Sequence, residues 1–89
     1  MSQQFIKYDL GHLSGGELIA VTLRERANVR LIDSSNLRLY ERRERFRFIG
    51  GQAQRSPVQL GGPRPDRWFV VIDRGGGSGT IHSTVSVTS

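Results

Sequence analysis

The stretch Arg67-Trp-Phe-Val-Val-Ile-Asp73 decides the fold class of this 89-residue chain. In an extended conformation successive side chains point to opposite faces, so this stretch is apolar on both sides. The two faces carry Trp68, Val70 and Ile72 on one side and Phe69 and Val71 on the other. A strand that is covered on both faces has this pattern. We therefore expect residues 67–73 to lie at the centre of a sheet.

Alternation of apolar and polar residues continues on both sides of this stretch. It is clearest at residues 80–88, where the pattern predicts a strand with one wet face. In that strand Ile81, Val85 and Val87 should face inward, and His82, Thr84, Ser86 and Thr88 should face solvent. Further strands are expected at residues 5–10, 29–33, 45–49 and 56–60, with a loop at residues 11–16.

Residues 17–24 are compatible with either a strand or a helix. Glu, Leu, Ala and Arg tolerate a helix, but the β-branched residues Ile19, Val21 and Thr22 and the preceding glycine pair favour a strand. Val29 and Leu31 should face the core of the strand that follows. Paired glycines recur between these segments and mark the turns, as in Gly50-Gly51, which is expected to end the strand at 45–49.

A short helical turn is predicted near residues 34–43. Asp33-Ser-Ser-Asn36 offers helix N-cap residues, and the apolar spacing that follows is helical. Two pairs, Glu41–Arg45 and Glu44–Arg47, are spaced for helical ion pairs. From residue 45 the period changes to two, so Phe46 and Phe48 are expected to be core residues.

The fold class follows from these segments. We predict an all-β protein, a small β-sandwich or jelly-roll-like barrel of about six to eight short strands, with one short helical turn near residues 34–43. A chain of this length forms one domain, so residues 1–89 are expected to be a single domain. The absence of cysteine excludes disulfides and thiolate metal sites.

The sequence resembles the domain of unknown function 1883 family, which consists of small bacterial all-β proteins. The resemblance covers nearly the whole chain, and its residues are Tyr8-Asp-Leu-Gly-His-Leu13, Gly16, Val21-Thr-Leu23, Ala27-Asn-Val-Arg-Leu31, Asp33-Ser-Ser-Asn36, Tyr40, Gly50-Gly51, Arg55-Ser-Pro57, Trp68, Asp73, Gly76, Gly79-Thr80 and Val85-Ser-Val87. It implies a compact all-β domain and no catalytic residues. Relatives that carry such a domain beside a Toll/interleukin-receptor-like domain imply a sensing or adaptor role by analogy. A weaker resemblance, at residues 29–36 and 68–72, is to the jelly-roll domains that follow secreted peptidases, and it implies a binding module.

Basic residues concentrate in the middle of the chain. The protein carries a net charge of +5, and its basic side chains are twelve arginines and a single lysine. Five arginines and two glutamates give residues 38–47 a charge of +3. The candidate binding face consists of Arg38, Tyr40, Arg42, Arg43, Arg45, Arg47 and Arg55. Guanidinium groups suit phosphate and carboxylate partners, but a solvated basic face has the same composition.

The residues that carry catalysis elsewhere lack the required spacing here. His12 and His82 form no metal-binding motif with the nearby acids, and no G-x-S-x-G sequence occurs. The glycine-rich stretch 75–79 lacks the Gly-Lys-Ser/Thr ending of a phosphate loop, and Asp33–Asn36 suits helix capping better than Ca²⁺ binding. We therefore expect no catalytic residue, metal or cofactor.

Several functions remain open from the sequence. The leading hypothesis is a non-catalytic binding or adaptor module that contacts its partner through residues 33–47. The alternatives are a nucleic-acid or other polyanion-binding protein that uses the arginines, and a carbohydrate-binding module that stacks sugars on Trp68 and Tyr40, although Trp68 is expected in the core. Edge pairing of the last strand would give a homo-oligomer. The N-terminus lacks a signal peptide and the longest apolar run is residues 68–72, so a cytoplasmic location without a membrane span is expected.

Overall fold

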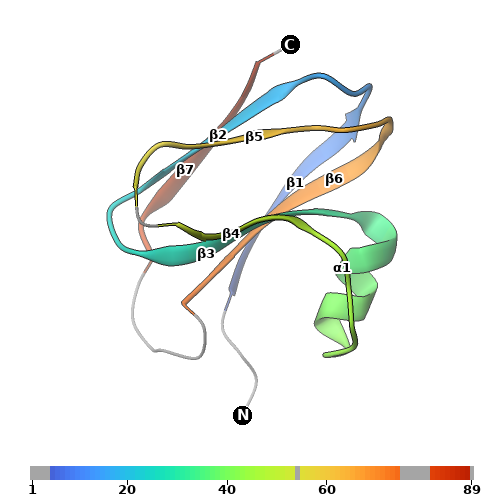
Figure 1. Cartoon of the computed structure of the whole chain (residues 1–89), viewed down its shortest axis with the longest axis horizontal. Coiled ribbons are helices and arrows are strands. Elements are labelled where there is room, and N and C mark those ends of the chain that lie inside the picture. Colours follow the sequence, from blue (N-terminus) through green and yellow to red (C-terminus); the bar gives the residue numbers. More distant parts are fainter. Residues whose placement is uncertain (1–4, 54, 75–80, 89) are drawn as a thin grey trace.

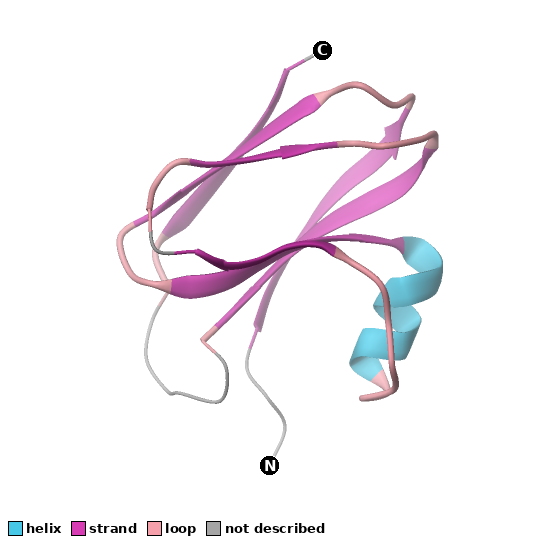
Figure 2. Ribbon diagram, viewed as in Figure 1, coloured by secondary structure: helices cyan, strands magenta, loops and turns pink. Residues whose placement is uncertain are grey.

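A computed structural model describes residues 5–53, 55–74 and 81–88 of the chain. Its elements in chain order are β1 (Phe5–Leu13), β2 (Leu18–Leu23), β3 (Ala27–Asp33), α1 (Ser34–Glu41), β4 (Ile49–Ala53), β5 (Val58–Gly61), β6 (Asp66–Asp73) and β7 (Ser83–Thr88). The strands form two antiparallel sheets (Figures 1 and 2). Sheet A has the order β1-β6-β3-β4 and sheet B has the order β5-β2-β7. The predicted all-β sandwich is confirmed, as two open sheets without closure into a barrel.

The main hydrophobic core lies between the two sheets. It is built from the inward-facing residues of both sheets, which follow the strand period of two. Its buried members are Leu13, Ile19, Val21, Leu23, Ala27, Val29, Leu31, Ala53, Leu60, Trp68, Val70 and Ile72. The strand interpretation of residues 17–24 is confirmed, because these residues form β2 of sheet B, which supplies three side chains to this core.

Strand β6 is buried on both faces, as its sequence predicts. It lies between β1 and β3 in sheet A. Trp68, Val70 and Ile72 face the core between the sheets, whereas Phe69 and Val71 face the opposite side, where they pack with Leu37 of α1. The helix therefore covers part of the outer face of sheet A, away from sheet B (Figure 1).

One of the predicted boundaries is wrong near the N-terminus. Residues 11–13 continue strand β1 where a loop was expected. A register shift between Asp9 and Gly11 opposite β6, with Gly11 at φ 73°, forms a bulge that lets the strand continue. The backbone N–H of Gly11 donates to the Asp9 carboxylate (2.9 Å), which holds the bulge.

The predicted strand at residues 45–49 is also wrong. Residues 44–48 form a loop, and β4 runs through the glycine pair that was expected to end a strand. Gly50 and Gly51 have φ values of 107° and 148°, and a Cβ at Gly50 would collide with the carbonyl oxygen of Val29. Phe46 is partly buried beneath α1, but Phe48 is 43% exposed, so its prediction as a core residue is wrong.

Strand β7 confirms the predicted alternation only in part. Ile81 and Val85 pack against the core, whereas Val87 is 42% exposed although it was expected to face inward. Val87 is the penultimate residue of an edge strand. The predicted loop at residues 75–79 lies outside the described residues.

In the described part of the chain, no helix has the length and apolar character needed to cross a membrane.

Candidate functional site

Five arginines are exposed on α1 and on the loop that follows it. We call residues 38–47 the arginine segment, after the exposed side chains Arg38, Arg42, Arg43, Arg45 and Arg47. Arg38 lies on the helix, and Arg42 is its C-cap residue. The ion pair between Arg42 and Glu44 is 4.0 Å long and joins two largely exposed side chains, so it holds the Arg42 guanidinium only weakly.

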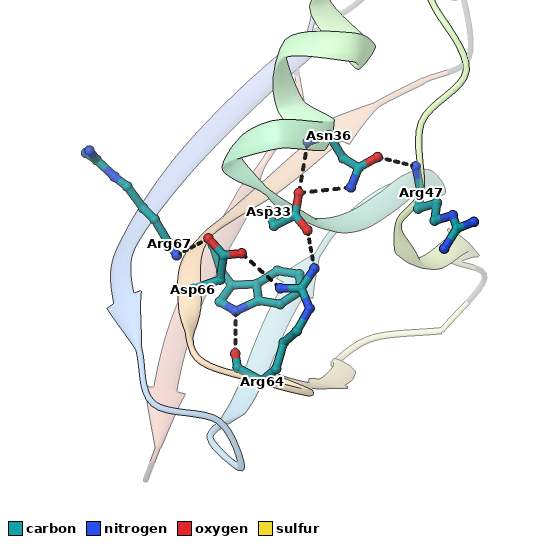
Figure 3. Close-up of polar contacts among 7 residues, drawn as sticks. Asp33, Asn36, Arg47, Arg64, Asp66 and Arg67 are labelled. Carbon is teal, nitrogen blue, oxygen red and sulfur yellow. Dashed lines mark hydrogen bonds and ion pairs between the residues drawn. The ribbon is translucent and has the colours of Figure 1, made fainter.

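The N-terminal end of α1 fixes where this segment lies. The Asp33 carboxylate accepts hydrogen bonds from the backbone N–H (2.8 Å) and side-chain amide (2.9 Å) of Asn36, so the predicted N-cap is confirmed. The Asn36 side-chain oxygen then accepts from the backbone N–H of Arg47 (2.7 Å). Figure 3 shows that the Arg47 side chain points away from this network. Asn36 thus connects the loop after α1 to the start of the helix, and the Arg47 guanidinium takes no part in this network.

The C-terminal end of α1 is a Schellman motif with arginine in the usual glycine position. The backbone N–H of Arg43 donates to the carbonyl of Tyr40 (3.1 Å), and that of Glu44 donates to the carbonyl of Leu39 (2.9 Å). Arg43 has a φ of 62°. A non-glycine residue in this left-handed region is strained by about 1 kcal/mol or more. The helix ends at Glu41, so the two predicted ion pairs lack helical spacing.

Tyr40 does not join the exposed arginines, although the sequence grouped them. Its ring is half-buried and makes edge contacts with Phe5 and Phe46, with centroids 5.3 and 5.1 Å apart. Its hydroxyl donates to the Asp73 carboxylate (2.8 Å). Burial, together with this hydrogen bond, raises the pKa of Tyr40 above its ordinary value. The tyrosine therefore anchors α1 to sheet A.

Asp73 is the centre of a buried polar network that the sequence did not reveal. Its side chain is fully buried at the end of β6. One carboxylate oxygen accepts from Asn28 (2.9 Å), and the other accepts from Arg30 (2.6 Å) and Tyr40. Three donors thus stabilise the buried charge. Asn28 and Arg30 lie on the outward-facing side of β3, directly beside β6.

Arg30 connects this buried network to the surface. Its guanidinium lies over the rings of Phe48 (5.2 Å) and Phe46 (6.0 Å). Phe48 follows the arginine segment directly and leads into β4, so an exposed aromatic ring stands beside the exposed arginines. The two-residue alternation of the sequence predicted that Phe48 is a core residue. The ring is exposed because residues 44–48 form a loop and not a strand.

Two hollows flank the edge strand β4, and each contains arginine. One has a volume of about 430 Å³ and is lined by Gly50, Gly51, Gln52, Ala53, Arg55, Pro57 and Val58. The other, of about 370 Å³, is lined by Arg26, Ala27, Asn28, Gln52 and Arg74. The described lining residues include no acid, and Gln52 is common to both hollows. Arg55 thus lies beside β4, and Arg26 and Arg74 join it from distant parts of the sequence.

Other charged residues of the chain are engaged in pairs that hold the fold. Arg64 bridges Asp33 and Asp66, and its guanidinium lies 5.0 Å from the ring of Trp68 (Figure 3). Burial alone would raise the pKa of Asp33, but hydrogen bonds from Asn36 and Arg64 hold it below its ordinary value. The hydrogen bond from Arg67, with that from the Gly11 N–H, lowers the pKa of Asp9.

The two histidines have different surroundings. His12 is exposed on β1, and His82 contacts Glu25 through Nδ1 (2.7 Å). Glu17 instead accepts hydrogen bonds from the backbone of Ser14 and Gly15, both at 2.8 Å. Within the described residues, no group of three or more metal-ligating side chains comes together. The described site is therefore a surface of arginines, amides and one aromatic ring.

Comparison with known proteins places the chain in a family. No curated protein and no solved structure matches it. A family model described as a domain of unknown function, DUF1883, matches residues 3–89, which confirms the resemblance seen in the sequence. Because the match spans nearly the whole chain, this protein belongs to the DUF1883 family.

Proposed function

We propose that this protein is a non-catalytic binding module whose partner is a polyanion. The observation that carries the proposal is the convergence of arginines from separate parts of the sequence around strand β4, with the exposed Phe48 ring among them. The arginine segment lies at one end of β4, and the β2–β3 turn and the end of β6 lie toward the other (Figure 1). The contact surface extends from Arg47 and Phe48 along β4 to Arg26 and Arg74.

Single-stranded nucleic acid is the polyanion that this surface fits best. Guanidinium groups bind phosphates, and an exposed aromatic ring offers a platform on which an unpaired base stacks. Phe48 supplies such a ring, and the guanidinium of Arg30 orients it from one side. Gly50 and Gln52 lie next along the strand, and both are exposed.

Two other partners fit this surface less well. An acidic peptide could add to the β4 edge as a further strand, but β4 has only five residues, and two of them are glycines, which weaken a strand. Sugar stacking on Trp68 and Tyr40 requires accessible rings, whereas Trp68 is 3% exposed and Tyr40 is packed between Phe5 and Phe46. The adaptor role and the cytoplasmic location stay predictions, and both are compatible with a nucleic-acid partner.

The proposal is tested by fluorescence anisotropy with a labelled oligothymidine of about 16 nucleotides. A duplex of equal length and polyglutamate serve as competitors. We expect the single strand to bind most tightly, with an affinity that falls as salt rises from about 50 to 200 mM, because each contacted phosphate releases counterions. Equal competition by polyglutamate would favour an acidic protein partner. No binding at low salt would rule out the polyanion proposal.

Three alanine variants separate charge from stacking. Arg47→Ala should weaken binding and reduce the slope of log affinity against log salt by about 0.7, the value for one phosphate on a single strand. Phe48→Ala should weaken binding by about 1–3 kcal/mol and leave the slope unchanged, since it removes stacking without charge. Arg24→Ala, which removes an exposed arginine from a different hollow between β2 and β7, is the matched control. An equal effect of Arg24→Ala and Arg47→Ala would contradict the proposed surface.

A further inference from the structure

The two open sheets leave four edge strands, namely β1 and β4 in sheet A and β5 and β7 in sheet B. An edge strand offers unpaired backbone groups to other chains, and proteins usually protect it with charge, proline, a bulge or short length. One of the four edges lacks such protection.

Three edges carry protective features. β1 exposes Lys7 and Asp9 and contains the bulge between Asp9 and Gly11. β4 has only five residues, and two of them are glycines, which weaken a strand. β5 has only four residues and directly follows Pro57. Each of these edges is thereby poorly suited to extending its sheet.

Strand β7 has none of these features. Its six residues, Ser-Thr-Val-Ser-Val-Thr from Ser83 to Thr88, include no charge, proline or glycine. They pair with β2 from Leu18 to Leu23 without a register shift. One exposed apolar side chain, Val87 at 42%, lies near the end of this edge. The edge is therefore regular, uncharged and partly apolar.

The hydrogen-bond alternation shows which backbone groups of β7 point outward. The backbone N–H of Arg24 donates to the carbonyl of His82 (3.3 Å), so the even-numbered residues of β7 direct their backbone groups toward β2. The odd-numbered residues direct theirs away from it. The Ser83 carbonyl accepts from the Tyr8 hydroxyl (3.0 Å), and no described strand pairs with the N–H and C=O groups of Val85 and Val87.

We propose that β7 pairs antiparallel with β7 of a second copy, so that two three-stranded sheets B form one continuous sheet. The absence of charge on β7 favours a second copy of this chain as the partner of this edge. The chain carries a net charge of +5, so two copies repel each other at most surfaces, but β7 carries no charge and can face itself without repulsion. The contact is isologous about a two-fold axis. It is independent of the proposed polyanion surface, which lies around β4.

Sedimentation velocity of the intact protein tests the proposal. The wild-type chain should sediment at twice the monomer mass of 10.0 kDa. Ser86→Lys and Ser86→Glu each place like charges across the two-fold and should shift the protein to monomer, whereas an equimolar mixture of the two should recover a dimer. Ser86→Thr is the matched control and should remain dimeric. Circular dichroism verifies that each variant is folded. A monomeric wild type, or a Ser86→Lys variant that remains a dimer, would overturn the proposal.

Cysteine crosslinking locates the contact, because the chain contains no native cysteine. Even-numbered residues of β7 occupy non-hydrogen-bonded positions of the new ladder, where facing Cα atoms are about 4.5 Å apart, within disulfide range. Ser86→Cys should form a covalent dimer on oxidation if the axis passes through residue 86. The Thr84→Cys/Ser86→Cys double variant should do so if the axis passes through residue 85. Lys7→Cys on the β1 edge should not crosslink. Crosslinking of Lys7→Cys alone would contradict pairing through β7.

Discussion

The arginines of this protein fall into two groups that differ in their partners. Arg30, Arg64 and Arg67 contact carboxylates of sheet A or of the residues next to it. The arginines of the arginine segment are exposed, and the ion pair of Arg42 with Glu44 is long and solvated. The guanidinium groups thus stabilise the fold in the first group and form a positively charged surface in the second. The difference is the location of a carboxylate: Asp73, Asp33 and Asp9 of sheet A accept hydrogen bonds from the first group. The acids within the arginine segment, Glu41 and Glu44, are exposed.

The largest effect should follow from removing the buried acid of the first group. Asp73→Ala leaves the donors of Asn28, Arg30 and Tyr40 without their common acceptor, and the Arg30 charge loses its partner. We expect the free energy of unfolding to fall by about 3–5 kcal/mol, as for other broken buried ion pairs. Urea denaturation followed by Trp68 fluorescence measures it. A loss below about 1 kcal/mol would mean that the network does not hold the sheet.

A smaller loss should follow at Asp33, where the acid caps a helix and contacts a half-exposed arginine. Asp33→Ala removes the N-cap and the Arg64 pair, and should lower the free energy of unfolding by about 1–2 kcal/mol. Asp33→Asn keeps a good cap and should lose less than about 1 kcal/mol, since Arg64 is half-exposed. Equal losses in the two variants would assign the stability to the ion pair and not to the cap.

The same residue predicts an acid dependence of stability. Its folded-state pKa lies below the ordinary value of 3.8, so the unfolded chain binds a proton more readily than the folded chain does. The contribution of Asp33 is complete above about pH 4 and is lost as the pH falls through the lowered folded-state pKa. Urea midpoints measured between neutral and acidic pH should therefore fall less steeply for Asp33→Asn than for the wild type.

In the second group, one substitution should increase stability. Arg43 occupies the left-handed position of the Schellman motif, so Arg43→Gly relieves backbone strain and should raise the free energy of unfolding by about 1 kcal/mol. The same variant should bind oligothymidine more weakly, because it removes a charge from the arginine segment. Gly61→Ala, where a Cβ meets open space and φ is not positive, provides a reference for a glycine change without strain. A destabilised Arg43→Gly would show that the arginine side chain is needed for the fold.

The smallest effect on stability should come from the exposed arginines themselves. Arg45→Ala removes an exposed side chain from the loop after α1, and should change the free energy of unfolding by less than about 0.5 kcal/mol. Thermal denaturation compared with that of Arg30→Ala measures the contrast, since Arg30 holds the buried Asp73. A comparable loss in both variants would remove the distinction between the two groups.

The helix cap and the strands could be read from the sequence because their signals are local. Asp33 and Asn36 are three residues apart, and the alternation of residues 67–73 predicts a strand buried on both sides. The exposure of Phe48 could not be read, because a period of two describes a strand, whereas residues 44–48 form a loop. Likewise, Gly50 and Gly51 resemble a turn in sequence, but their positive φ values are accommodated inside β4.

The sequence by itself determined the family, the all-β class, the central strand and the capped helical turn, since each depends on residue types a few positions apart. Only the tertiary structure decided which arginines are structural, which rings are exposed and which edges are open. Arg30 and Asp73 are 43 residues apart, and Arg64 and Asp33 are 31 apart. Such pairs form only when the strand order β1-β6-β3-β4 brings distant segments of the chain side by side. The fold therefore decides which arginines contact a carboxylate of sheet A and which lie on the surface.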